Sequence, residues 1–133
     1  MPLTLQMILP DRRIELHGLV SVVFQSVEGE LGILAGHAPL VCEVRAGTLC
    51  ATAEGQRRQR FATGQGLARI SEDCVRLLMM DLIAEEEIDG AAAGRLLQRA
   101  RAEAAVHAAG DSESAELVRF AEAQFALAGN GTI

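Results

Sequence analysis

The first 83 residues alternate apolar and polar positions with the two-residue period of β-strands. Turn-forming pairs such as Pro10-Asp11, Ala46-Gly47 and Glu54-Gly55 separate the apolar stretches. The pattern predicts strands over residues 3–9, 14–24, 40–44, 48–52, 59–62, 67–70 and 75–82. Many short strands at close spacing favour an antiparallel sandwich or barrel over a sheet of alternating strands and helices.

The last 50 residues show the period of amphipathic helices instead. Asp89 is the expected N-cap of a first helix, and small or apolar residues then recur at helical spacing in two runs. The runs are Leu96, Leu97, Ala100, Ala104 and Ala108, then Leu117, Phe120, Ala121, Phe125 and Ala128. Gly110-Asp111-Ser112 separates them and Gly129-Asn130-Gly131 ends the second, which predicts an antiparallel helical hairpin. Alanine faces bury little area, so the hairpin should need the β-unit or a partner to hold one position.

Composition divides the chain at the same point. Residues 1–83 contain 7 Ala and 8 Arg against 9 acids, whereas residues 84–133 contain 15 Ala and 4 Arg against 9 acids. Alanine with Arg and acids favours helix. We therefore expect a β-sandwich domain over residues 1–84 and an α-helical hairpin domain over residues 85–133.

Composition also excludes several functions. A net charge of -6 and only 3% aromatic residues argue against a nucleic-acid partner. The 12 basic residues are all Arg, so lysine-based phosphate binding and Schiff-base chemistry are impossible. Three cysteines without CxxC spacing predict neither a disulfide framework nor a zinc site, but small buried side chains. The N-terminus does not have a signal-peptide pattern, and no apolar stretch reaches the ~20 residues of a membrane span, so we expect no direct membrane insertion.

The most unusual segment spans residues 28–40. It contains Gly29-Glu30-Leu31-Gly32-Ile33 followed by Gly36-His37-Ala38-Pro39-Leu40. Three glycines and a proline between short apolar pieces predict a tight loop lying between strands, with the glycines allowing positive φ or close backbone approach.

These two runs resemble the signature of the epsilon subunit of the rotary F-type ATP synthase, which is the delta subunit in mitochondria. The Pro10-Asp11 turn, the Arg45-Ala46-Gly47-Thr48-Leu49 turn and the Ala-rich C-terminal helices agree, so the resemblance covers the whole chain. It implies a ten-stranded β-sandwich followed by a helical hairpin. It also implies a non-catalytic rotor subunit without a cofactor, in the central stalk at the cytoplasmic face of the bacterial membrane. Its partners would be the gamma subunit and the c-ring, and its hairpin can extend to the catalytic β-subunits and block ATP hydrolysis.

The resemblance assigns a first set of candidate residues to a loop that faces the c-ring: Glu28, Gly29, Glu30, Leu31, Gly32 and His37. Glu30 would pair with basic ring residues there, whereas the sequence alone favours a solvent-exposed turn acid. His37 is explained equally well as a ring or stalk contact and as a buried loop histidine that fixes backbone carbonyls. A second set, which would face acidic segments of the β-subunits or form an ordinary solvated surface, is Arg95, Arg99, Arg101 and Arg119.

Some bacterial members bind ATP in the folded hairpin through Ile or Leu, Asp, two variable residues, Arg and Ala. Here Ile88, Asp89 and Ala93 match, but Ala92 occupies the arginine position. Alanine cannot supply charge-assisted bonds to phosphate, so we expect weak ATP binding or none. This argues against the main alternative function, a free-standing ATP-sensing protein.

Three other groups of polar residues are better explained by structural roles than by chemistry. A Cys42–His37 nucleophilic pair would make the chain a small β-sandwich enzyme, but position 42 lies in an apolar strand that reads as core. The acidic run Glu85-Glu86-Glu87 with Asp89 could chelate a hard cation, yet stabilising the following helix N-terminus is the better account, and we predict no metal site. A basic arm at Arg57, Arg58 and Arg60 is best explained as charge protecting an edge strand.

Overall fold

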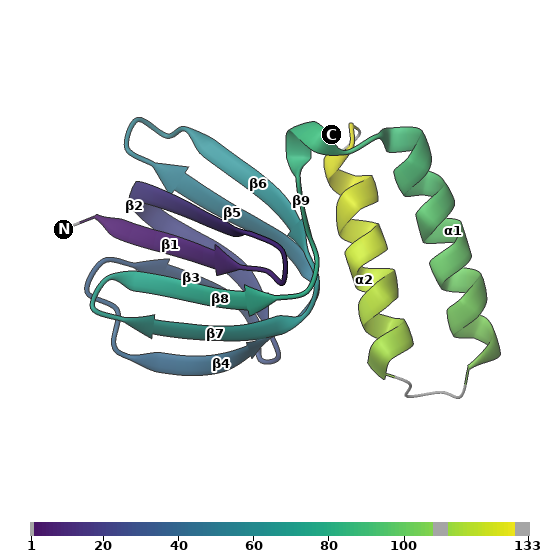
Figure 1. Cartoon of the computed structure of the whole chain (residues 1–133), viewed down its shortest axis with the longest axis horizontal. Helices are drawn as coiled ribbons and strands as arrows, with labels where there is room; N and C mark the ends of the chain where they lie inside the picture. The colour runs from purple at the N-terminus through teal and green to yellow at the C-terminus, as the bar shows by residue number, and fades with distance from the viewer. Residues whose placement is uncertain (1, 108–111, 130–133) are drawn as a thin grey trace.

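The computed structural model describes residues 2–107 and 112–129. Within them, nine strands precede a short 3₁₀ helix and two α-helices, which confirms the predicted sandwich and hairpin (Figure 1). The strands are β1 (Leu3–Ile8), β2 (Arg13–Ser26), β3 (Gly29–Leu34), β4 (Leu40–Val44), β5 (Gly47–Ala53), β6 (Arg58–Thr63), β7 (Gly66–Ser71), β8 (Cys74–Met79) and β9 (Leu82–Ala84). The helices are η1 (Glu85–Glu87), α1 (Gly90–Val106) and α2 (Ser112–Leu127).

Two strand layers pack against each other and share the long strand β2. One layer has the order β1-β8-β7-β4, and the other contains β3, β2, β5, β6 and β9. The first part of β2 pairs with β1, and its second part pairs with β3 and β5. Because β2 serves both layers, the sheet wraps around a single core (Figure 1).

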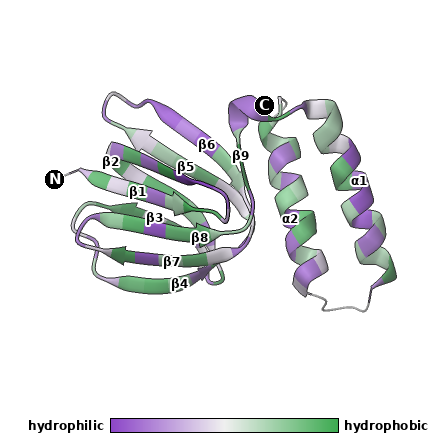
Figure 2. Cartoon of the chain, in the orientation of Figure 1, coloured by the Kyte–Doolittle hydropathy of each residue, from purple (hydrophilic) through white to green (hydrophobic). Residues whose placement is uncertain are grey.

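The core follows from alternation along the strands. In β1, Leu3, Leu5 and Met7 are at most 1% exposed, while the residues between them are half-buried. Phe24 and Val22 enter the same core from β2. Figure 2 shows the resulting mixture of apolar and polar positions along each strand.

The segment expected to be one tight loop contains a strand. Gly29–Leu34 forms β3 and pairs antiparallel with β2 along its whole length. Ile33 is fully buried and Leu31 half-buried, whereas Glu30 is exposed, so a two-residue period persists despite the glycines. Only residues 35–39 form the connection to β4.

Three further details differ from expectation. The resemblance implied ten strands, but the described residues form nine. The sandwich is not wholly antiparallel, because β1 pairs with β8 in parallel. The strand expected over 75–82 is divided at Met80-Asp81, since β9 leaves the first layer and pairs with β6 in the second.

The helical hairpin lies beside one end of the sandwich. Asp89 caps α1 as predicted: its side chain accepts the N–H of Ala91 at 3.2 Å. Helix α2 lies between the sandwich and α1 (Figure 1), and Ala121 and Ala123 on α2 are buried.

The predicted helix ends are only partly visible. Ser112 begins α2, and Gly129 follows its last turn. The remaining residues of the predicted break and stop, together with Ala108 of the first run, lie outside the described residues: Gly110, Asp111, Asn130 and Gly131.

Candidate functional site

The glycine-rich motif reaches two opposite ends of the sandwich. Glu28 lies in the β2–β3 turn at the end nearest the hairpin, which we call the hairpin-side end. His37 follows β3, whose six residues span about 17–20 Å, and lies at the other end, which we call the far end. The structure therefore corrects the expectation that Glu28 to His37 form a single loop surface.

Two of the motif glycines have the backbone conformation that was predicted for them. Gly29 and Gly36 adopt φ values of 117° and 82°, which side chains other than glycine rarely tolerate. Gly32 sits within β3, and a Cβ there would lie 3.9 Å from Val23 Cγ2, an ordinary contact. The backbone conformation therefore requires glycine at Gly29 and Gly36, on either side of the β3 interior, but neither φ nor space requires it at Gly32.

A hollow of about 510 Å³ with acidic walls runs from the hairpin-side end along β3 and β4. Glu28, Glu30 and Glu43 line it from three different segments, and Val41 adds a side chain that is 70% exposed. The β2–β3 turn is fixed by Ser26, whose hydroxyl donates to the carbonyl of Gly29 at 2.8 Å and accepts the N–H of Glu28 at 3.1 Å. An acidic rim with apolar contacts suits a basic, partly apolar partner surface.

The far end is held together by the aspartate of the β7–β8 turn. Asp73 Oδ1 accepts the N–H of Gly36 at 2.7 Å, and its own carbonyl accepts the N–H of Thr4 at 3.0 Å. His37 Nδ1 lies 2.7 Å from the carbonyl oxygen of Ala38 and donates to it. His37 thus bonds to a backbone carbonyl, but it is half-buried rather than buried.

Cys42 does not have the properties of a nucleophile. Its thiol is half-buried beside the core, and burial raises its pKa, with the negative charge of Glu28 adding to the effect. The thiolate is the reactive form, so a raised pKa opposes covalent catalysis. Cys50 and Cys74 are likewise half-buried rather than fully buried as expected.

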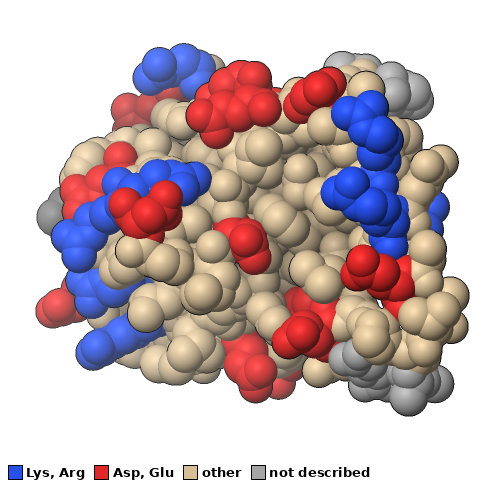
Figure 3. Space-filling view, turned by 45° about the vertical axis from the view of Figure 1, so that its right-hand side comes forward, with Lys and Arg blue, Asp and Glu red and all other residues tan. Residues whose placement is uncertain are grey.

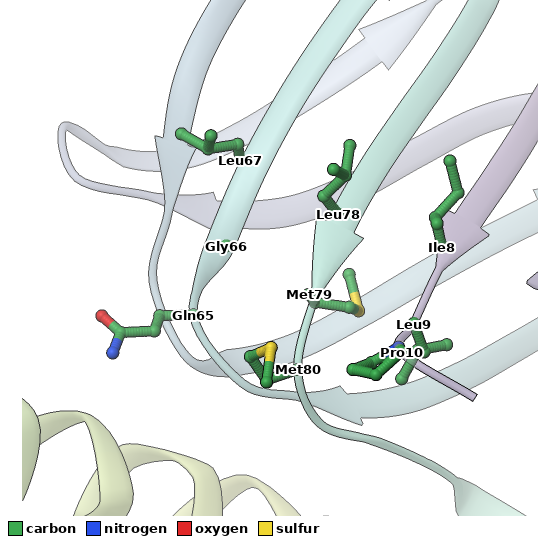
Figure 4. A pocket seen from close by; sticks show the side chains of 9 residues that line it. All are labelled: Ile8, Leu9, Pro10, Gln65, Gly66, Leu67, Leu78, Met79 and Met80. Carbon is green, nitrogen blue, oxygen red and sulfur yellow. The ribbon is translucent and has the colours of Figure 1, made fainter. Parts of the chain in front are cut away.

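Sequence reasoning missed an apolar patch on the outer surface of the first layer. We define the apolar patch as Ile8, Leu67, Leu78 and Met80. Leu67, Leu78 and Ile8 are neighbours across β7, β8 and β1, and their side chains project from the same face (Figure 4). Leu67, Leu78 and Met80 are 53%, 48% and 70% exposed, and the patch lines a shallow hollow of about 360 Å³. Contiguous exposed apolar side chains of this kind mark interaction surfaces.

Charged residues border the apolar patch. Towards the far end, Arg69 and Arg76 are direct cross-strand partners, a like-charge arrangement that is unfavourable by itself. Arg76 Nε donates to Gln6 Oε1 at 2.9 Å, and Gln6 Nε2 donates to Glu15 Oε2 at 2.9 Å, so a chain of two hydrogen bonds links Arg76 to a carboxylate. At its other border, Leu67 is the cross-strand partner of Glu43, so the apolar patch adjoins the acidic hollow.

Comparisons with known proteins identify the family. A family model described as "ATP synthase, Delta/Epsilon chain, beta-sandwich domain" matches residues 2–85. The ATP synthase epsilon chain of Chelativorans sp. (strain BNC1) is 31% identical over 111 residues, 84% of this chain and 81% of that one. The ATP synthase epsilon chain of Ruminiclostridium cellulolyticum is 38% identical over 96 residues, 72% of this chain and 71% of that one.

The chain belongs to the ATP synthase delta/epsilon chain family.

Solved structures agree with this fold. A chain of the Euglena gracilis mitochondrial ATP synthase (OSCP/F1/c-ring) has a TM-score of 0.76 and 22% identity, with 91% of this chain and 78% of that chain covered. A chain of the Tetrahymena thermophila mitochondrial ATP synthase (central stalk/c-ring) has a TM-score of 0.58 and 13% identity, covering 100% and 98%. At these identities the likeness establishes the shared fold.

The four hairpin arginines of this family member do not share one surface. Arg95, Arg99 and Arg101 are exposed on α1, and Figure 3 shows basic side chains gathered in a column on the hairpin. Arg101 also contacts Glu122 of α2 at 3.4 Å. Arg119 instead faces the sandwich and is 34% exposed, which corrects its expected grouping with the other three.

The residues that match the family's ATP motif have structural roles here. Asp89 caps α1, and Ala93 is 2% exposed. Ala92 is exposed and offers only a methyl group where the motif has arginine. A neighbouring hollow of about 430 Å³ is lined by Gly90, Ala91, Gly94, Arg95, Leu97, Gln98, Arg101 and Phe125.

The acidic run after β9 is used within the fold. Glu85 contacts Arg60 of the basic arm at 3.4 Å, and Glu87 accepts the N–H of Ala84 at 3.4 Å. Across residues 2–107 and 112–129, His, Cys, Asp and Glu side chains nowhere gather in a group suited to a metal ion. Neither described helix is both long enough and apolar enough to cross a bilayer.

Proposed function

We propose that the chain is a non-catalytic rotor subunit of an F-type ATP synthase that links the gamma subunit to the c-ring. The observation that carries this proposal is the apolar patch beside the acidic hollow, two adjoining surfaces of different chemistry on one rigid sandwich. Family membership supports it, and so does the likeness to chains of the Euglena and Tetrahymena ATP synthase assemblies that contain a c-ring. The subunit would act at the cytoplasmic face of the bacterial membrane as a peripheral component.

The gamma subunit is the proposed partner of the apolar patch. Leu67 and Leu78 are each about half exposed to water. A partner that covers them removes this apolar area from water without any rearrangement of the sandwich. A long-lived contact between two rotor components needs such a desolvated centre with a polar border. Arg69 and Arg76 provide that border and favour carboxylates at the facing positions.

The c-ring is the proposed partner of the hairpin-side end. Glu28 and Glu30 are exposed there, and Glu43 adds a third carboxylate to the same hollow. Basic groups on the ring's polar loops would complement them. Gly29, Leu31 and Gly32 position these acids through β3, whereas His37 at the far end would contact another part of the stalk.

The hairpin is proposed to regulate ATP hydrolysis. Arg95, Arg99 and Arg101 are exposed on the outer helix, where they are accessible to acidic segments of catalytic β-subunits. This contact would require the hairpin to change position relative to the sandwich, as a two-state element does when a partner binds one state better.

Co-purification from an assembled ATP synthase tests the proposed partners. A tagged chain should recover gamma and the c-ring together. Charge removal in the double variant Glu28→Gln, Glu30→Gln should reduce c-ring recovery while leaving gamma in place. A tagged chain that is folded yet recovers neither partner would reject the proposed function.

Removal of the hairpin tests regulation separately. A chain that ends at Ile88 should still assemble into the rotor and should raise ATP hydrolysis by the complex. Unchanged hydrolysis would remove the inhibitory role of the hairpin and leave the linking role intact.

A further inference from the structure

The turn between β4 and β5 is held by two side chains of α2. Glu116 Oε1 accepts the backbone N–H of Ala46 at 2.7 Å, and Arg119 Nε donates to the carbonyl oxygen of Ala46 at 3.1 Å. Ala46 is fully buried. The backbone N–H and C=O of this buried residue are thus hydrogen-bonded to side chains of the hairpin rather than to a neighbouring strand.

The same side chains form a partly desolvated charge network. The Glu116 carboxylate is only 12% exposed and lies 3.5 Å from Arg45 Nε and 3.7 Å from Arg119 Nε. By contrast, the Arg101–Glu122 pair within the hairpin has side chains 60% and 48% exposed. Water and salt weaken the exposed pair much more than the network around Glu116.

None of the large apolar side chains of α2 is fully buried. The buried apolar residues that α2 contributes are Ala121 and Ala123, whose methyl groups bury little area. The main hydrophobic core of the described residues is built entirely from the strands and their connections, without a hairpin residue. The sandwich can therefore stay folded when the hairpin leaves.

We propose that Glu116 and Arg119 form a release latch that holds the hairpin on the sandwich through the backbone of Ala46. While both side chains bind Ala46, the hairpin stays docked. When either contact is lost, α1 and α2 separate from the sandwich, and water replaces Glu116 and Arg119 at the β4–β5 turn. Arg119 cannot serve the latch and an outside partner at once, so its release is part of any repositioning of the hairpin.

Amide hydrogen exchange followed by NMR on the isolated full chain tests the latch. The variants are Glu116→Ala and Arg119→Ala, and the matched control is Glu122→Ala, which removes an acid of the same helix that pairs with Arg101 of α1 rather than with Ala46. Alanine is the best helix former, which offsets the loss of the i,i+3 pair between Glu116 and Arg119 within α2. Amides of residues 124–127, which lie more than one position from every changed side chain including the control, report undocking of α2.

Each latch variant should raise the exchange rates over residues 124–127 about ten- to hundredfold, which corresponds to losing one hydrogen bond to a charged group. Amides in β1 and β2 should keep their wild-type rates. Glu116→Gln retains an acceptor for Ala46 while losing the charge, so it should give a smaller increase.

Two results would overturn the latch. One is that Glu116→Ala accelerates α2 no more than Glu122→Ala does. The other is that β1 and β2 amides accelerate in parallel with α2, which would mean that the hairpin leaves only when the whole chain unfolds. The measurement uses no other subunit, so its outcome is independent of whether the chain assembles into a rotor.

Discussion

Replacing Leu67 and Leu78 with threonine tests the apolar patch quantitatively. Fully burying a leucine contributes about 1.5–3 kcal/mol. These two side chains are 53% and 48% exposed, so only about half of that remains to be gained on docking, about 1 kcal/mol for each residue. The double variant should therefore weaken binding to the gamma subunit by about 2 kcal/mol, which is about thirtyfold in Kd. Threonine keeps the preference for strand conformation, so the fold should tolerate both changes.

The assay is isothermal titration of the cognate gamma subunit with the wild-type chain and its variants. Leu34→Thr is the matched control, because Leu34 is a strand leucine that is 62% exposed but lies on β3, outside the apolar patch. Its Kd should stay within twofold of wild type, and thermal unfolding should show that all three proteins are folded. If the double variant binds gamma as tightly as Leu34→Thr does, the apolar patch is not the gamma-binding surface.

Three other measurements test the remaining assignments. Gly66→Ala should destabilise the sandwich by about 3 kcal/mol or more, because a Cβ there would lie 1.9 Å from the carbonyl oxygen of Leu78, whereas Gly32→Ala should have little effect on the unfolding midpoint. Alkylation of Cys42, followed by peptide mass spectrometry, should need a higher pH than alkylation of an unfolded thiol, and Glu28→Gln should lower that pH because it removes one cause of the raised pKa. Calorimetric titration should detect no micromolar ATP binding, since Ala92 has no cationic group for phosphate; micromolar affinity would contradict the reading of the hairpin motif.

The sequence predicts correctly those elements that depend on residues close together in the chain. Alternation in residues 3–8 placed β1, and Asp89 was correctly recognised as a helix cap because its side chain bonds to the backbone two residues later. β3 was missed because its glycines resemble loop residues. Yet Leu31 and Ile33 point inward as strand residues do, so the two-residue period was the better signal.

The remaining features depend on contacts between distant parts of the chain. Parallel pairing of β1 with β8 joins segments about 70 residues apart, and no local pattern encodes that choice. The apolar patch arises because Ile8, Leu67 and Leu78 occupy outward positions of strands that already bury their alternate residues. In the sequence, an apolar residue at an outward position cannot be told from a core residue. The pairing register of the folded strands shows that its side chain is exposed.

The hairpin shows how such long-range contacts change the meaning of a charge. Arg119 resembles the α1 arginines in sequence, but its guanidinium binds the carbonyl of Ala46, 73 residues away. Glu116 lies beside it, so the docked face of α2 presents a paired acid and base to the sandwich rather than a free cation. Among the described hairpin residues, Arg95 and Arg99 of the outer helix are then the exposed cations open to an acidic partner, because Arg101 is paired with Glu122. A partner that competes for Arg119 must first break the Ala46 contact, so its binding free energy is reduced by the cost of undocking the hairpin.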